Sequence, residues 1–395
     1  MPLDQASLFE DVQDALQLDD YQDFTAISDR SGASGAEGRG FVMLGLFGEV
    51  GSLLSALKKK RRDKDAFVAY DAAVVEELGD VLWYLANAAA RFGLRLTELA
   101  ARVVAPQSHA PTRVTTFAHL QARGATAAED SLAFERRLIE LAARSGALLD
   151  SFATGRIDNN RDRAAADLVE VFRALVRAAD DAGISLEVAA RRNIAKSEGR
   201  WPRQMTWGES YDQRFPENER FPRRMVFEFS EKVAPEGTHV TLKMNGSSVG
   251  DMLTDNRGIP DDYRFHDIFH LAHVAVLGWS PTLRRMLRLK RKSDPRVDEN
   301  EDGARATLIE EGIASWIFNH AARAMFFRST IAVDYGLLKS VHEFVQGYEV
   351  ESRPLWQWER AILEGYRVFR LLKEHREGTV TVDLDEHSLT FVPKR

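Results

Sequence analysis

The stretch from Leu46 to Leu85 reads LFGEVGSLLSALKKKRRDKDAFVAYDAAVVEELGDVLWYL. Its apolar residues recur at helical spacing on both sides of a charged centre, which predicts two amphipathic helices. Glu49 lies on the first helix, and Glu77 and Asp80 lie on the second. Because residues three apart share a helix face, Glu77 and Asp80 point the same way, beside an apolar seam. The stretch therefore predicts a helical bundle with carboxylates gathered at the edge of its core.

Carboxylates in such a place need a cation. Glu49, Glu77 and Asp80 offer the hard oxygen ligands that Mg²⁺ prefers, and such a site leaves coordination positions open for phosphates and water. We therefore expect a Mg²⁺ site for a nucleotide, with Mn²⁺ as an alternative ion. An acid that the metal does not fully engage, Glu76 or Glu77, would take a proton. The alternative is an ordinary helix pair with acids at its exposed edges.

The motifs GEVGSLLSALKK and EELGDVLWYL resemble those of the MazG-type all-α nucleoside triphosphate pyrophosphohydrolases, E-x-x-E, a spacer and E-x-x-D. The upstream segment 20–30, DYQDFTAISDR, is similar to the opening helix of that family. The resemblance covers roughly the first hundred residues. It implies Mg²⁺-dependent hydrolysis of a (deoxy)nucleoside triphosphate to the monophosphate and pyrophosphate. Ser52 stands where the family has its second glutamate, and a neutral hydroxyl would hold one metal loosely or lose it.

Further residues near this motif are candidates for contact with the substrate. Lys58 and Lys59 suit the negative end of a helix dipole and could instead hold triphosphate oxygens, as lysines follow this helix in the family. Asn87 is seven residues past Asp80 and on the same face, so it could bind a base or sugar, unless it is a plain exposed asparagine. The Gly/Ser-rich segment 28–40, before a helix expected near Phe41, predicts a mobile loop, either a lid or a linker.

The pattern returns later in the chain. After a break at 106–111, residues 77–100 align without a gap with residues 167–190, and glycines and leucines match. The acids persist as Asp167 and Glu170, but Arg144 stands where the first copy has Glu49. This predicts an internal duplication whose two helix pairs bury their apolar stripes against each other. The first copy would supply the metal ligands and the second a wall of the pocket.

The segment RRNIAKSEGRWP ends this half of the chain and resembles the asparagine-lysine-arginine tail of the same family. Asn193 and Lys196 are therefore candidates for substrate binding, and Lys196 in particular for phosphate contact. The alternative is a solvated helix end.

The C-terminal third resembles no family that we can place on it. After a boundary near 202–221, alternating runs at 225–232 and 239–246, and again at 379–384 and 388–392, predict two β-hairpins with helices between them. Basic residues gather between Arg284 and Lys292, directly before the acidic run 298–303. The basic run could contact a phosphate-bearing ligand or nucleic acid, or the two runs could neutralise each other on a solvated surface.

His266, His270 and His273 fall on one face of a predicted helix, at i, i+4 and i+7. Imidazoles one turn apart can hold a transition metal, and a carboxylate from another helix would complete the site. Glu310 and Glu311 are the natural donors. The alternative is histidines that are solvated or that cap the core.

The composition excludes several classes of protein. The 395 residues include no cysteine, which excludes disulfides, thiolate metal sites and a cysteine nucleophile. The net charge of -7 argues against a general nucleic-acid binder. No apolar run approaches the ~18 residues that span a bilayer, and the acidic N-terminus MPLDQASLFEDVQDAL lacks the features of a signal peptide. We expect a cytoplasmic protein without membrane partners, and a homo-oligomer stays open.

Together these patterns predict a mainly α chain. Residues 1–105 would form the MazG-like repeat with the metal site, 106–205 the degenerate repeat, and 206–395 a mostly helical α+β domain. The expected activity is pyrophosphohydrolysis. Two alternatives remain: a nucleotide sensor with weak or no hydrolysis, and a metal-dependent hydrolase centred on His266 and His270.

Overall fold

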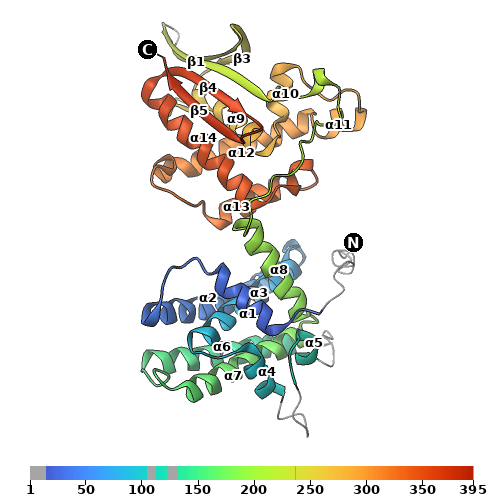
Figure 1. Cartoon of the computed structure of the whole chain (residues 1–395), viewed down its shortest axis with the longest axis vertical. Coiled ribbons are helices and arrows are strands. Elements are labelled where there is room, and N and C mark those ends of the chain that lie inside the picture. The colour runs from blue at the N-terminus through green and yellow to red at the C-terminus, as the bar shows by residue number, and fades with distance from the viewer. Residues whose placement is uncertain (1–14, 105–112, 122–130, 236, 395) are drawn as a thin grey trace. The chain divides into compact units, whose positions relative to one another are not determined.

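The computed structural model describes residues 15–104, 113–121, 131–235 and 237–394. The chain forms two compact units, Met1–Trp201 and Pro202–Arg395. The first is helical and the second combines helices with one antiparallel sheet (Figure 1), which confirms the expected mainly α fold with an α+β C-terminal part. The break expected at 106–111 lies outside the described residues.

The core of the first unit is a four-helix bundle made of two antiparallel helix pairs, α2 with α3 and α6 with α7. Helix α2 also packs on α6, and α3 on α7. Each of the shorter helices α4 and α8 packs against the opposite helix pair: α4 packs on α7, and α8 packs on α3. The helices of this unit are α1 (Leu18–Ser28), α2 (Gly35–Asp63), η1 (Lys64–Ala66), α3 (Tyr70–Arg91), α4 (Leu96–Val104), α5 (Phe117–Leu120), α6 (Ser131–Ala153), α7 (Arg161–Asp181) and α8 (Leu186–Arg200).

The turns that follow α3 and α7 are built alike, as the predicted duplication requires. Each has a glycine in the left-handed region, Gly93 with φ 68° and Gly183 with φ 70°. The residue after each glycine donates a backbone hydrogen bond across the turn. The two bonds are Leu94 N to Ala89 O and Ile184 N to Ala179 O, both 2.9 Å.

A glutamine caps each of these turns in the same way, which extends the repeat to α1 and α5. The amide of Gln22 donates to the last carbonyl of the first turn, and its oxygen accepts from the first N–H of α4. Gln121 makes the same pair of bonds to the second turn and to α8. The backbone partners are Leu94 O (2.9 Å), Leu96 N (3.1 Å), Ile184 O (3.3 Å) and Leu186 N (2.7 Å).

Helix α2 begins before the residue that the sequence suggested. The Gly/Ser-rich segment was expected to be a loop as far as Gly40, but the helix already begins at Gly35. The loop before it is tied down by Arg91, which donates to the carbonyl of Ala33 at 2.9 Å and pairs with Asp29 at 2.5 Å. Gly38 leaves room for this guanidinium, because a Cβ there would lie 1.9 Å from it.

One described stretch, Gly35–Ala66, is long and apolar enough to cross a membrane by length and composition, a test that core helices of soluble proteins also pass. It contains Glu49, and a charge at the centre of a span costs about 2.5–3.5 kcal/mol or more. It also packs along its length on α3 and α6. We therefore interpret it as a bundle helix.

The second unit packs its helices around α9, every residue of which is buried. Helix α9 contacts α14, α10 and α12, and it also lies against strands β4 and β5. The helices are η3 (Glu217–Glu219), η4 (Tyr263–Phe265), α9 (Asp267–Leu277), α10 (Pro281–Leu287), α11 (Pro295–Asn300), α12 (Ala304–Arg323), η5 (Met325–Phe327), α13 (Tyr335–Phe344), η6 (Glu349–Ser352) and α14 (Leu355–His375).

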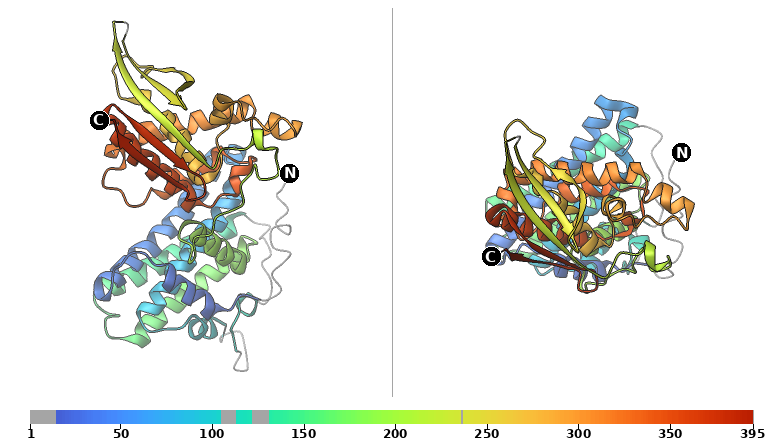
Figure 2. Two further views of the ribbon diagram at one scale, coloured as in Figure 1. Left: turned by 45° about the horizontal axis from the view of Figure 1, so that its top comes forward. Right: turned by 90° about the horizontal axis from the view of Figure 1, so that it is seen from above.

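The two predicted hairpins are present and join into one sheet of order β3-β2-β1-β4-β5. The junction is the antiparallel pair of β1 and β4, in which Phe227 lies opposite Val380. The third strand, β3, was not predicted, because its sequence SSVGDML does not alternate. Figure 2 shows β1 and β2 extending past the helices that cover the sheet. The strands are β1 (Arg224–Ala234), β2 (Gly237–Met244), β3 (Ser247–Leu253), β4 (Glu377–Asp383) and β5 (Ser388–Pro393).

The basic and acidic runs of this unit pair with each other, but largely inside it. Arg291 is buried and forms ion pairs with Asp302 and with Glu349, both at 2.7 Å. Arg284 is also buried and pairs with Asp212 at 2.9 Å. The expectation of a solvated surface was wrong for Arg284 and Arg291, which join α10 and its flanking loops to the core, whereas Arg285, Arg288 and Lys292 are exposed and Lys290 pairs with Asp298.

Candidate functional site

The acidic cluster predicted from the sequence is assembled in the first unit. Glu49 on α2 and Glu77 and Asp80 on α3 each place one carboxylate oxygen within 4.8 Å of the others. The carboxyl groups of Glu49 and Glu77 are close enough for the charge of Glu49 to raise the pKa of Glu77. The second oxygen of Glu77 is buried and has no hydrogen-bond partner in the described part of the chain. The arrangement therefore offers several oxygens to a single point.

Burial and mutual repulsion raise the pKa values of the acids in this cluster. Burial and the charges of Glu49 and Asp80 raise the pKa of Glu77 to about 7. Burial, together with the charge of Asp80, also raises the pKa of Glu49. Like charges held close in a partly dry place have this effect, and a bound divalent cation would reverse it.

Helix α8 of the second copy completes the cluster. Lys196 lies 2.5 Å from Asp80 and 3.2 Å from Glu76, and the amide of Asn193 donates to Asp80 at 2.8 Å. The side-chain oxygen of Asn193 in turn accepts from the hydroxyl of Tyr21 at 3.2 Å. Burial raises the pKa of Asp80, and Lys196 opposes that rise. The predicted Asn193 and Lys196 therefore lie beside the acids, in contact with Asp80 and Glu76.

Gly79 allows this close approach of α8 to α3. A Cβ at position 79 would lie 2.7 Å from the carbonyl oxygen of Ala189 and 3.2 Å from the Cβ of Asn193. Glycine in a helix interior costs about 0.8–1.0 kcal/mol relative to alanine. This loss of helix stability occurs at the residue next to Asp80, where the two helices are in contact.

Other predicted substrate residues lie away from the acids. Lys58 and Lys59 are exposed at the end of α2, and Lys58 is nine residues and about 13 Å along the axis from Glu49. Asn87 is buried at 3% exposure, and its amide donates to the carbonyl of Trp83 at 3.2 Å. The alternative of an exposed asparagine was wrong. Ser52 is half-buried, one helical turn after Glu49.

In the second copy, arginine side chains stand beside the acids where the first copy would hold a metal ion. Arg144, which aligns with Glu49, lies 3.7 Å from Glu170, the equivalent of Asp80. Arg173 also pairs with Glu170, and Arg163 pairs with Asp167 at 3.2 Å. Among the described residues, no group of potential metal ligands is found on α6 and α7. The second copy therefore balances its acids with arginines.

The second unit brings together all five residues of the predicted histidine cluster. His266, His270 and His273 come from the start and middle of α9, and Glu310 and Glu311 from α12. The Nδ1 atoms of His270 and His273 lie 3.0 and 2.9 Å from the same oxygen of Glu310. The side chains of the three histidines, of Glu310 and of the neighbouring Asp267 are at least nine-tenths buried. Glu311, in contrast, keeps 34% of its side chain exposed.

Burial and neighbouring charges shift the pKa values of several residues in this cluster. Although burial opposes it, the nearby Glu310 and Glu311 raise the pKa of His270 well above its ordinary value. Burial also opposes ionisation of Glu310, yet His270 and His273 hold its pKa well below the usual range. Burial lowers the pKa of His266 and raises that of Asp267. The sequence analysis had named Asp267 only as the residue after the first histidine, and the structure makes it part of the cluster.

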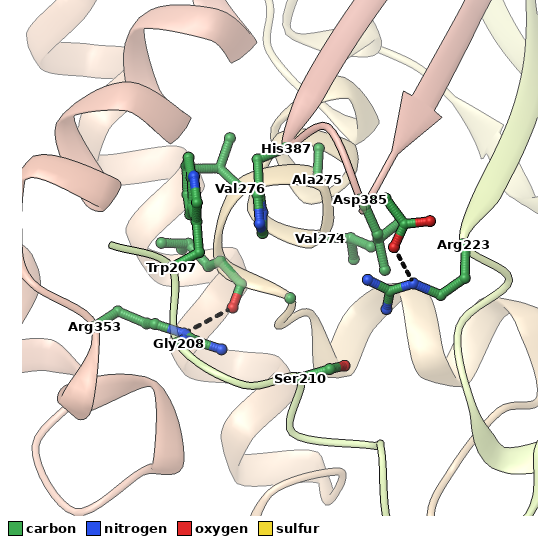
Figure 3. A pocket seen from close by; sticks show the side chains of 13 residues that line it. Trp207, Gly208, Ser210, Arg223, Val274, Ala275, Val276, Arg353, Asp385 and His387 are labelled. Carbon is green, nitrogen blue, oxygen red and sulfur yellow. Dashed lines mark hydrogen bonds and ion pairs between the residues drawn. The ribbon is translucent and has the colours of Figure 1, made fainter. Parts of the chain in front are cut away.

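A cavity of about 160 Å³ lies at the C-terminal end of α9 in the same unit. Figure 3 shows Trp207 against His387, whose rings stack with centroids 3.6 Å apart. Arg353 donates to two backbone carbonyls, and Arg223 pairs with Asp385 at 2.8 Å. Because Arg353 and Arg223 already have partners, this cavity is a weaker candidate for a functional site than the two clusters.

Comparison with known proteins places a family on the second unit. Residues 207–395 match the family model described as the MazG C-terminal domain. The expectation that this part resembles no family was therefore wrong. A curated relative, the Gene 37 protein of Mycobacterium phage L5, is 37% identical over 68 residues, which is 17% of this chain. The matched region spans 60% of the length of the phage protein. No solved structure matches. The chain is therefore similar to MazG proteins through a domain that fills almost all of its second unit.

Proposed function

We propose that the protein is a Mg²⁺-dependent pyrophosphohydrolase that cleaves (deoxy)nucleoside triphosphates to monophosphate and pyrophosphate. The observation that carries the proposal is the acidic cluster of Glu49, Glu77 and Asp80, with Lys196 beside it. The match to a MazG C-terminal domain supports the same activity class from the other end of the chain. Motif, geometry and family likeness thus agree on the kind of chemistry.

The residues of the cluster fit a divalent cation of the Mg²⁺ type. Glu49, Glu77 and Asp80 would hold it, because all three offer oxygen and one buried oxygen of Glu77 has no hydrogen-bond partner among the described residues. When bound, Mg²⁺ would neutralise phosphate charge and acidify a water molecule. Three carboxylates can hold one ion. A second ion would bind less tightly, because Ser52 offers a neutral hydroxyl in place of a carboxylate.

The protein groups have separate tasks in this proposal. An acid that the metal does not fully engage, Glu76 or Glu77, accepts the proton of the attacking water. Asn193 orients Asp80 through its hydrogen bond. Lys196 supplies a positive charge for the leaving pyrophosphate. The water oxygen bonds to the α-phosphorus, and the bond from that phosphorus to the oxygen bridging to the β-phosphorus breaks.

A nucleotide sensor without hydrolysis is the second candidate, and Ser52 favours it. A site that lacks one of four acids can bind a metal–triphosphate complex and turn it over slowly. Calorimetry with a triphosphate that stays intact in Mg²⁺ and in Mn²⁺ would support the sensor.

A nucleotide panel tests the proposed function. The full chain is incubated with each ribo- and deoxynucleoside triphosphate in Mg²⁺, in Mn²⁺ and in EDTA, and pyrophosphate is measured. We expect pyrophosphate with at least one nucleotide in the presence of metal, and none in EDTA. Release of orthophosphate instead, or no release with any nucleotide, would contradict a pyrophosphohydrolase.

A further inference from the structure

We propose that the second unit holds a divalent transition-metal ion, bound by the imidazoles of His266 and His270 and the carboxylates of Asp267 and Glu311. This second metal site is independent of the acidic cluster and has a different donor set. We call these four residues the α9–α12 site. The argument rests on which atom of each histidine faces the carboxylates, on the partners of the opposite ring atoms, and on unpartnered buried atoms.

The Nε2 atoms of the two histidines face the same carboxylate. Glu311 Oε2 lies 3.8 Å from Nε2 of His266 and 3.4 Å from Nε2 of His270. Asp267 Oδ1 lies 3.8 Å from Nε2 of His266. His266, Asp267 and His270 each also have one ligand atom within 4.8 Å of the others. Glu311 is not part of that group, so the four side chains border one region at the start of α9 but do not all face a single point.

These separations suit an ion between the ligands. Ligand atoms about 2.0–2.1 Å from a tetrahedral ion lie about 3.3–3.4 Å from one another. Three of the ligand pairs lie 3.4–3.8 Å apart, which is slightly wider, and the remaining pairs must close by a larger side-chain movement before all four ligands meet one ion. Glu311 is the partly exposed member and gives the ion a route from solvent.

The opposite nitrogens of both rings face fixed oxygens, as in many protein metal sites. The Nδ1 atom of His266 is 3.0 Å from the backbone carbonyl of Tyr263, whose ring also stacks on the imidazole. The Nδ1 atom of His270 is 3.0 Å from Glu310. The outer partner of His266 places its ring proton on Nδ1 and leaves the Nε2 lone pair for the metal, whereas Nδ1 of His270 lies close to Glu310 but is not aligned for a hydrogen bond.

Glu310 is itself held in position, so it supports the site and need not bind the ion. One of its oxygens accepts from the hydroxyl of Ser280 at 2.9 Å and from the backbone N–H of Thr282 at 3.0 Å. The other faces His273 at 2.9 Å. A fully buried carboxylate with this many partners is built to orient His270.

Two buried groups remain unpartnered without an ion. Neither ring nitrogen of His270 makes a hydrogen bond of acceptable geometry within the described residues, although the ring is 1% exposed. The Oδ2 atom of Asp267 also has no partner there. Buried polar atoms left unpaired cost about 1–3 kcal/mol each, and coordination would remove that loss.

The donor set indicates the class of metal. Imidazole with carboxylate suits Zn²⁺, Mn²⁺ or Fe²⁺, whereas Mg²⁺ prefers oxygen alone. Four protein ligands that are mostly buried resemble a closed, structural site. We therefore expect the ion to stabilise the second unit.

Metal binding by the full chain tests this inference. Purified protein is stripped of metal and titrated with Zn²⁺ or Co²⁺ in a large excess of Mg²⁺, which occupies the oxygen-only cluster. We expect one tight equivalent per chain, and a higher midpoint of thermal unfolding with the ion. Glu311→Gln and His266→Gln should each weaken binding at least tenfold, and Glu310→Gln by roughly 10–100-fold.

Matched variants keep the result interpretable. Glu311 is the partly exposed ligand, so its variant should retain the far-ultraviolet circular dichroism of the parent chain. His320→Gln, at an exposed histidine of the same helix, and Glu77→Gln, in the acidic cluster, should both keep the tight equivalent. No tight equivalent in the parent chain, or equal binding by Glu311→Gln and His320→Gln, would overturn the proposal.

Discussion

Replacing Gly79 by alanine should separate the structural role of α8 from its chemical one. The new Cβ would lie 2.7 Å from the carbonyl oxygen of Ala189, whereas ordinary contacts begin at 3.4 Å. Helix α8 must therefore move away from α3 by about 0.7 Å, because interiors have no free volume to absorb an added methyl group. That shift occurs where Asn193 and Lys196 reach Asp80.

The expected free energies nearly cancel. Alanine gains about 0.8–1.0 kcal/mol of helix propensity over glycine, and overpacking costs typically 1–3 kcal/mol. We expect a net loss of about 0–2 kcal/mol in the free energy of unfolding, measured with urea. Misplacing catalytic groups by about 1 Å can cost on the order of a hundredfold in rate. We therefore expect pyrophosphate release to fall at least tenfold while the protein stays folded.

Gly48→Ala is the matched control for this prediction. Gly48 is also inside a helix, next to Glu49, but a Cβ there would meet nothing within 4 Å. This variant should gain about 1 kcal/mol and keep its activity. If Gly79→Ala were as stable and as active as Gly48→Ala, the inferred contact of α8 with the site would be wrong.

Three further predictions follow from the acidic cluster. The pKa of Glu77 rises from 4.5 to about 7 on folding. Between about pH 4.5 and 7 the metal-free native state therefore binds more protons than the unfolded chain, so the stability of the protein should fall as the pH rises through this range. Melting curves with and without Mg²⁺ check this, and Mg²⁺ should reduce the fall. Ser52→Glu should lower the Mg²⁺ concentration needed for half-maximal activity, measured by metal titration; an unchanged titration would mean that three carboxylates suffice. Lys196→Met should lower kcat at least tenfold yet keep Mg²⁺ binding, measured by steady-state kinetics and calorimetry, and an unchanged kcat would exclude Lys196 from pyrophosphate stabilisation.

The sequence predicted side chains that share a helix face. Glu77 and Asp80, or His266 and His270, meet because helix periodicity alone places them together. The second copy was visible for the same reason, since Gly93 and Gly183 follow helices with matching apolar stripes. Periodicity also indicated the two hairpins, although β3, which does not alternate, escaped it.

Contacts between distant segments were harder to predict. Nothing in the periodicity of α8 shows that Lys196 reaches Asp80, and only the resemblance of the tail suggested Asn193 and Lys196. The capping roles of Gln22 and Gln121 depend on turns more than 60 residues away. Glu310 was expected as a metal donor, and it does lie within 4.8 Å of His270 and His273. Its hydrogen bonds from Ser280 and Thr282, which arise from tertiary packing, were not predicted.

The central claim is that the first copy alone carries a working metal site. Measuring Mg²⁺-dependent pyrophosphate release by Glu77→Gln and by Asp167→Asn tests it most directly, since these positions are equivalent in the two copies. We predict that Glu77→Gln abolishes release while Asp167→Asn leaves it within a factor of two or so, because Asp167 is paired with Arg163 and belongs to no group of potential metal ligands among the described residues. Full activity of Glu77→Gln, or equal loss in both variants, would contradict the account.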